Sequence, residues 1–214
     1  MALSLIVFDC DGVILESVDV KTQAFARIGA EFGQEARDRL VAYHRIHGGV
    51  SRYKKFEWFY REVLGRTISK EEMETLGEKF AAHAYAEVMR CPLVPGVREV
   101  LDHWHGRTPM YVASGAPHAE LMTILAERGL DRFFAGIHGS PPGKAELLRG
   151  IVAGLRVHPS DAIMIGDSMT DQYAAEAAQT RFYGRGEYFR HSGYPWHEDL
   201  TRLNEHLEEL SAEP

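Results

Sequence analysis

The chain has 214 residues, of which 45% are hydrophobic and 26% are charged, and its formal net charge is −7. This length and composition are typical of a globular protein with one sizeable domain, or a domain with a smaller insert. The acidic balance argues against a nucleic-acid partner, because no excess of basic residues is available to neutralise phosphates. With two cysteines and no long apolar run, we expect a cytoplasmic protein without disulfides or a membrane partner.

The first predicted strand, Leu3–Phe8, ends in two aspartates, Asp9 and Asp11, which are followed by Gly12. Because side chains alternate along an extended segment, we expect both carboxylates to face the same way. Two acids at one strand end repel each other and lose solvation, so they require a cation, a shared proton or open water. Aspartate is also a common turn residue, which would explain this segment without any chemistry.

The segment before the next strand is far longer than one crossover requires, and most of it has the pattern of helices. We therefore predict a helical cap domain over residues 16–91, mounted over the strand ends of a core formed by residues 1–15 and 92–214. The helices predicted within the cap are Val20–Phe32, Glu35–His47, Lys54–Leu64 and Lys70–Met89.

The remainder of the chain alternates between short apolar runs and helical segments. The predicted strands are Met110–Ala113, Phe134–His138, Ala162–Ile165 and a weaker Thr180–Tyr183. The predicted helices are Val97–Trp104, Ala119–Arg128, Ala145–Ala153, Asp171–Ala178 and a last one at Leu200–Leu210. This alternation predicts an α/β fold, a Rossmann-like parallel sheet with crossover helices, which binds its ligands beyond the carboxyl ends of the strands.

Polar residues follow each of these strands, with Ser114 and Gly115 after the second, Lys144 after the third, and Asp167 and Asp171 after the fourth. In a parallel sheet they gather at one edge, together with the first two aspartates. Several carboxylates suit a hard cation such as Mg²⁺, while a hydroxyl, a loop amide and a lysine can bind phosphoryl oxygens. Each residue has a structural explanation on its own, but their order along the chain favours a phosphoryl-transfer site.

These motifs resemble those of the haloacid dehalogenase superfamily, in the branch that carries a helical cap after the first motif. The segment Asp9–Val13 resembles the first motif, Ser114 the second, Lys144 the third and Gly166–Asp171 the fourth. The resemblance extends over the chain to about Arg185 and implies a phosphoryl-transfer enzyme similar to phosphoglycolate phosphatases or to β-phosphoglucomutase.

The resemblance also implies roles for the acidic residues. Asp9 would attack phosphorus and form an aspartyl-phosphate, and Asp11 would protonate the leaving oxygen and later activate water. Mg²⁺ would be held by the Asp9 carboxylate, the backbone carbonyl of Asp11 and Asp167. Asp171 would support this metal site through water or through contacts with the other ligands.

Ser114, the Gly115 amide and Lys144 would hold the transferred phosphoryl group, with Lys144 also orienting the nucleophile. Two segments depart from the family pattern: Val13 stands where many family phosphatases have threonine, and the residues around the lysine, Pro141–Glu146, differ from the frequent form. Neither departure removes a functional group.

Within the cap, Gly48 and Gly49 predict a sharp break before Arg52. The segment Gly49–Arg52 resembles the substrate-specificity loop of β-phosphoglucomutase, in which an arginine grips the phosphate that is not transferred. We therefore predict that Arg52 binds the non-reacting end of the substrate, although a solvated helix start explains it equally well. Lys21 is a weaker candidate for the cleft, and we assign the aromatic residues after Arg52 to the cap core.

The leading functional hypothesis is a Mg²⁺-dependent phosphatase of a small phosphorylated metabolite, acting as a monomer or homodimer. A phosphomutase acting on a sugar phosphate is the alternative, favoured by Val13 and the Arg52 loop. A non-catalytic metabolite-binding protein of the same fold is the third. Dehalogenase and phosphonate-cleaving activities are disfavoured, because those branches have no aspartate at the position of Asp11.

Overall fold

The structure, a computed structural model, describes residues 3–212 and contains a six-stranded, fully parallel sheet in the order β3-β2-β1-β4-β5-β6. The predicted Rossmann-like α/β fold is confirmed. The strands are β1 (Leu5–Phe8), β2 (Met110–Pro117), β3 (Gly136–Ser140), β4 (Ala162–Gly166), β5 (Arg181–Arg185) and β6 (Trp196–His197).

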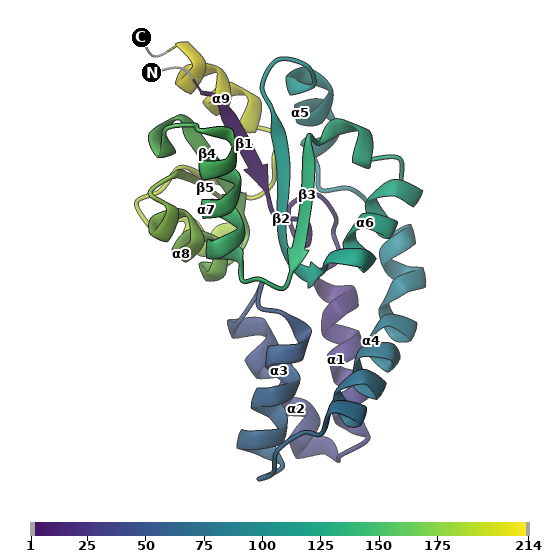
Figure 1. Cartoon of the computed structure of the whole chain (residues 1–214). Helices are drawn as coiled ribbons and strands as arrows, with labels where there is room; N and C mark the ends of the chain where they lie inside the picture. Colours follow the sequence, from purple (N-terminus) through teal and green to yellow (C-terminus); the bar gives the residue numbers. More distant parts are fainter. Residues whose placement is uncertain (1–2, 213–214) are drawn as a thin grey trace.

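Helices cover both faces of the sheet, which explains why the central strand is apolar throughout (Figure 1). Ile6 and Phe8 of β1 pack on one face and Leu5 and Val7 on the other, and all four are fully buried. The first face is covered by α5 (Val97–Trp104), α6 (His118–Glu127) and α9 (Leu203–Ala212), and the second by α7 (Lys144–Leu155) and α8 (Met169–Ala178).

Four helices between β1 and β2 form a cap beyond the carboxyl ends of the strands (Figure 1). Phe25, Phe56 and Phe80 meet in its centre, with ring centroids 4.6 to 6.3 Å apart. Of the aromatic residues after Arg52, Phe56, Phe59 and Tyr60 are buried in the cap core as predicted, whereas Tyr53 is exposed. The cap helices are α1 (Val18–Ala30), α2 (Gln34–Ile46), α3 (Arg52–Trp58), which continues into a π-helical turn (Phe59–Val63), and α4 (Lys70–Arg90).

The two connections between cap and core run side by side. Leu15 and Leu93 form an antiparallel bridge. The Glu16 amide donates to the Pro92 carbonyl at 3.0 Å, and the Val94 amide donates to the Ile14 carbonyl at 3.1 Å. The cap is therefore attached to the core through one short two-stranded ribbon. The exact division at residues 16 and 91 stays a prediction.

Several element boundaries differ from those predicted. Strand β2 continues through Ser114 to Pro117 instead of ending at Ala113, because an irregularity in its pairing with β3 lets it extend past the apolar run. The two-residue strand β6 is too short to leave a periodic pattern, and α9 begins at Leu203. Single 3₁₀ turns lie at Asp131–Phe133, Pro159–Asp161 and Glu187–Phe189.

Among the described residues, no helix combines the length and apolar character that crossing a membrane requires.

Candidate active site

Asp9 is the first residue beyond β1, and its side chain is held in one orientation. Its backbone amide donates to the Ile165 carbonyl of β4 at 2.9 Å, which continues the sheet past the end of the strand. One carboxylate oxygen accepts the Cys10 amide at 2.7 Å, and the other lies 2.8 Å from the Lys144 ammonium. Because Asp9 is only 1% exposed, its carboxylate has little freedom to reorient.

Lys144 connects Asp9 to Asp171 inside the core. It begins α7, is buried, and pairs with both carboxylates. Asp171 lies in the first turn of α8, where it accepts the amide and the hydroxyl of Ser168 at 3.1 and 2.6 Å. Burial alone would lower the pKa of Lys144, but the charges of Asp171 and Asp9 outweigh it and raise that pKa. Lys144 therefore stays charged and fixes the Asp9 carboxylate from the buried side.

Asp9, Asp167 and Asp171 form an acidic group that could hold a metal ion, with carboxylate oxygens within 4.8 Å of one another. Burial raises the pKa of Asp9 to about 7 despite the opposing charge of Lys144, and Asp171 adds to the rise. Burial, Asp171 and Asp9 also raise the pKa of Asp167 well above its ordinary value. Carboxylates crowded in this way repel one another, and a hard divalent cation with oxygen ligands would relieve the repulsion.

The turn after Asp11 requires a glycine. Gly12 has a φ of +77°, and a Cβ atom there would lie 2.1 Å from a carboxylate oxygen of Asp167. A side chain at this position would therefore push Asp167 away from the other acids.

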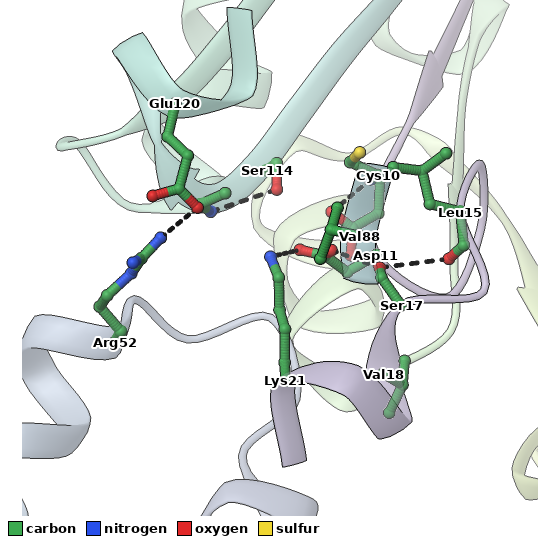
Figure 2. Close-up of polar contacts among 12 residues, drawn as sticks. Cys10, Asp11, Leu15, Ser17, Val18, Lys21, Arg52, Val88, Ser114 and Glu120 are labelled. Carbon is green, nitrogen blue, oxygen red and sulfur yellow. Dashed lines mark hydrogen bonds and ion pairs between the residues drawn. The ribbon is translucent and has the colours of Figure 1, made fainter. Parts of the chain in front are cut away.

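The Asp11 carboxylate lies outside this acidic group and is bound by the first cap helix. Ser17 and Lys21, at the start of α1, both donate to it (Figure 2). Burial alone would raise the pKa of Asp11, but the charge and hydrogen bonds of Lys21 and Ser17 outweigh it and hold that pKa below its ordinary value. Asp11 is therefore ionised in this arrangement, the form in which it can accept a proton.

A cavity of about 530 Å³ separates the sheet edge from the cap. Its lining includes all of the sequence-predicted site residues except Lys144, which contacts Asp9 from within the core, and Asp171, which pairs with Lys144. The polar and glycine residues from the core are Asp9, Asp11, Ser114, Gly115, Asp167 and Ser168, and those from the cap include Lys21, His44, Arg45, Gly48, Gly49, Arg52 and Lys55.

The second motif directly contacts the cap loop, which is the segment of residues 47–51 between α2 and α3. The Ser114 oxygen accepts the Ala116 amide at 3.2 Å, which leaves its hydroxyl proton available as a donor toward the cavity. A Cβ atom on Gly115 would lie only 1.9 Å from the Gly49 carbonyl oxygen. The Thr170 hydroxyl donates to the Gly48 carbonyl at 2.6 Å. The cap loop therefore contacts both the second motif, at Gly115, and the fourth motif, at Thr170.

Arg52 lines the cavity but already has an acidic partner. It is 5% exposed, lies 4.4 Å from the Phe80 ring centroid and pairs with Glu120 of α6 (Figure 2). Binding of a substrate anion by Arg52, which stays a prediction, has to exchange this partner. The observed contact shows a different role, because it joins the cap to the core.

The sequence analysis missed two buried titratable residues of the cap, Lys55 and His44. The Lys55 ammonium lies 2.9 Å from His44 Nδ1, and His44 Nε2 lies 3.2 Å from the Thr22 hydroxyl. Burial lowers the pKa of His44 to about 3 and that of Lys55 to about 7. The signal that could have found Lys55 is its spacing of three residues from Arg52, which places both on one helix face.

These features define a capped enzyme for an anionic substrate. They are a parallel α/β core with acids at the strand ends, a buried lysine, and a helical cap over the same edge. Residues 3–179 match the model of the haloacid dehalogenase-like hydrolases, and the chain belongs to that family. The family resemblance found in the sequence is thereby confirmed.

The curated relatives are named as phosphatases. Phosphoglycolate phosphatase 1 of Pseudomonas aeruginosa is 29% identical over 200 residues, which cover 83% of this chain and 67% of the relative. The phosphorylated carbohydrates phosphatase of Thermotoga maritima is 26% identical over 85% of both chains. A β-phosphoglucomutase structure from Clostridium difficile superimposes with a TM-score of 0.80 at 19% identity, over 99% of this chain and 97% of that one. The last similarity shows the shared fold.

We expect Gly115→Ala to displace the cap loop, because its Cβ would meet a backbone carbonyl at 1.9 Å. The free energy of unfolding should fall by about 1–3 kcal/mol, as for other overpacked sites. Hydrogen exchange of the amides in residues 48–51 should accelerate. Gly150→Ala is the control, since nothing lies within 4 Å of a Cβ there. Exchange and stability equal to those of the wild type would contradict the proposed contact.

Because burial lowers the pKa of His44, we expect the folded protein to lose stability in mild acid. The unfolded chain binds a proton there near pH 6.5, whereas the folded chain binds it only near pH 3. Stability therefore falls as the pH drops from 6.5 toward 3, by up to about 1.4 kcal/mol per pH unit for this group. At pH 5, urea unfolding of His44→Gln should show about 2 kcal/mol less loss, relative to pH 7, than the wild type. The same change at exposed His191 should leave the pH dependence unaltered, and a parallel dependence in both variants would refute the assignment.

Proposed function

We propose that the protein is a Mg²⁺-dependent phosphatase that hydrolyses a small phosphorylated metabolite through an aspartyl-phosphate on Asp9. The observation that carries the proposal is the immobilised Asp9 carboxylate, which lines the cavity while Lys144 holds it from behind. The phosphatase names of the curated relatives support the same reaction. The cavity volume of about 530 Å³ suits a small metabolite.

Asp9, Asp167 and the backbone carbonyl of Asp11 would hold the Mg²⁺, with Asp171 in support. When bound, the ion neutralises charge on the carboxylate nucleophile and on the phosphoryl oxygens. The crowding that raises the pKa values of Asp9 and Asp167 is the property of this site that favours a cation.

In the first half of the reaction, a carboxylate oxygen of Asp9 attacks phosphorus and the bond from phosphorus to the ester oxygen breaks. Asp11 gives a proton to that leaving oxygen. Because Lys21 favours the ionised form of Asp11, we expect the contact between them to loosen when substrate enters. The Ser114 hydroxyl donates to a phosphoryl oxygen during this step.

In the second half, water attacks phosphorus and its proton passes to the Asp11 carboxylate. The bond between phosphorus and Asp9 breaks, which releases phosphate and restores the nucleophile. The observed contacts of Asp11 with Ser17 and Lys21 suit this half, since they stabilise the proton-accepting form. Residues of the cap and of the core together line the cavity in which this reaction would take place.

Phosphate release from a panel of esters tests this proposal, with phosphoglycolate and fructose 1-phosphate as first members. Release by the wild type should require Mg²⁺, and Asp9→Asn should lower kcat by about 10³-fold or more, because the covalent nucleophile is lost. Asp167→Asn should raise the Mg²⁺ concentration for half-maximal rate. Asp102→Asn, on an exposed helix face, should behave as wild type.

Circular dichroism should show all three variants folded, since each substitution keeps the side-chain shape. Full activity in Asp9→Asn would refute the assignment of the nucleophile, and release that persists in excess chelator would refute the metal requirement. Conversion of one sugar phosphate isomer to another without phosphate release would select the mutase alternative.

A further inference from the structure

Helix α3 places two cations on the face that packs into the cap. Its buried face consists of Arg52, Lys55 and Phe56, and Phe59 continues the same stripe at the next turn. This spacing of three, four and seven residues is that of an amphipathic helix, in which apolar residues normally occupy every inward position. Lys55 is 3% exposed and lines the catalytic cavity. A lysine is rarely buried in this way without an acidic partner.

Lys55 differs from two other cations that line the cavity, the half-buried Lys21 and the buried Arg52, in the kind of partner it has. Lys21 meets Asp11, and Arg52 meets Glu120. Within residues 3–212, the ammonium of Lys55 has the imidazole of His44 as its hydrogen-bond partner and no carboxylate within ion-pair distance. Of these three cations, Lys55 is therefore the one whose positive charge has no carboxylate partner.

The hydrogen bonds around His44 fix which way the donors point. The Thr22 hydroxyl donates to the Val18 carbonyl at 2.8 Å, so its oxygen accepts the proton of His44 Nε2. His44 Nδ1 is then the acceptor for Lys55. This contact uses one of the three protons that a lysine ammonium carries, which leaves two donors for a ligand.

The surroundings of Lys55 disfavour its charge until an anion arrives. Burial, reinforced by the charge of Lys21, lowers the pKa of Lys55 to about 7. The Phe25 ring centroid, 5.3 Å from the ammonium, offers a weak cation–π contact and not a full counter-charge. A carboxylate or phosphate in the cavity would supply the missing counter-charge and two hydrogen-bond acceptors. Arg45 also lines the cavity, but it is exposed and its charge is solvated.

We propose that Lys55, held by His44, binds a second anionic group of the substrate and so selects phosphate esters that carry a carboxylate or a further phosphate. This inference rests on the proposed phosphatase function and specifies its substrate class. The reacting phosphoryl group lies at Asp9, and the second anion lies at the cap side of the same cavity. Discrimination against an uncharged analogue arises because that analogue leaves the Lys55 ammonium unpaired.

Two pairs of esters that differ in the second anion test the proposal. Phosphoglycolate is compared with ethyl phosphate, and glucose 1,6-bisphosphate with glucose 1-phosphate. Lys55→Met should lower kcat/KM for the doubly anionic member by about 10- to 100-fold, the effect of removing a hydrogen bond between charged groups. The loss should lie mainly in KM, and the singly phosphorylated partner should change less than about threefold.

Lys54→Met provides a matched control, because Lys54 is the neighbouring residue on the exposed face of α3. It should retain wild-type kinetics on all four esters. Lys55→Gln keeps a donor for His44 without the charge, so it should show the same selective loss as Lys55→Met. Removal of a buried charge should leave the melting temperature unchanged or higher, which separates the kinetic effect from unfolding.

The outcomes show whether the second anion is a carboxylate or a phosphate. They also separate a failure of the Lys55 proposal from a failure of the proposed phosphatase function. A loss confined to phosphoglycolate identifies a carboxylate, and one confined to the bisphosphate identifies a second phosphate. Equal losses for both members of a pair, or none, overturn the role of Lys55. If the wild type releases phosphate from no ester, the phosphatase proposal fails. Calorimetric binding of phosphoglycolate and ethyl phosphate to Asp9→Asn, with and without Lys55→Met, then tests Lys55 independently of turnover.

Discussion

The buried contact of Lys144 with Asp9 and Asp171 is the interaction on which the rest of the site depends. Three elements meet at this point, because β1 ends just before Asp9, α7 begins at Lys144, and Asp171 lies in the first turn of α8. Without the lysine, burying these carboxylates together would raise their energy further, since like charges in a low dielectric repel strongly. The sheet positions these groups, and their charges in turn constrain where the two helices begin.

Much of this arrangement follows from the sequence, because parallel strands bring their carboxyl ends to one edge. Asp9, Ser114 and Asp167 could be placed there from the apolar runs that precede them. The partner of each side chain could not be predicted in the same way. Nothing in the local sequence around Arg52 indicates Glu120, which lies 68 residues further along the chain.

The cap shows the limit of periodicity more clearly. Lys54 and Lys55 are adjacent and chemically identical, yet one is exposed and the other is buried against the cavity. Their assignment depends on the rotation of α3, which Phe56 and Phe59 set by packing into the aromatic core. The predicted helix Lys54–Leu64 had the right location. However, α3 begins at Arg52 and ends in a π-helical turn, which changes which residues lie on its buried face.

The ribbon formed by Leu15 and Leu93 has a consequence for how such a chain can vary. Because the two ends of the insert lie side by side, the entropic cost of closing it rises only slowly with its length, by about 0.6 kcal/mol for each doubling. The cap is topologically equivalent to a loop at a hairpin end. The strands that carry the acids would keep their register if that loop were shortened, enlarged or replaced, so selectivity can diverge while the chemistry at the sheet edge stays intact.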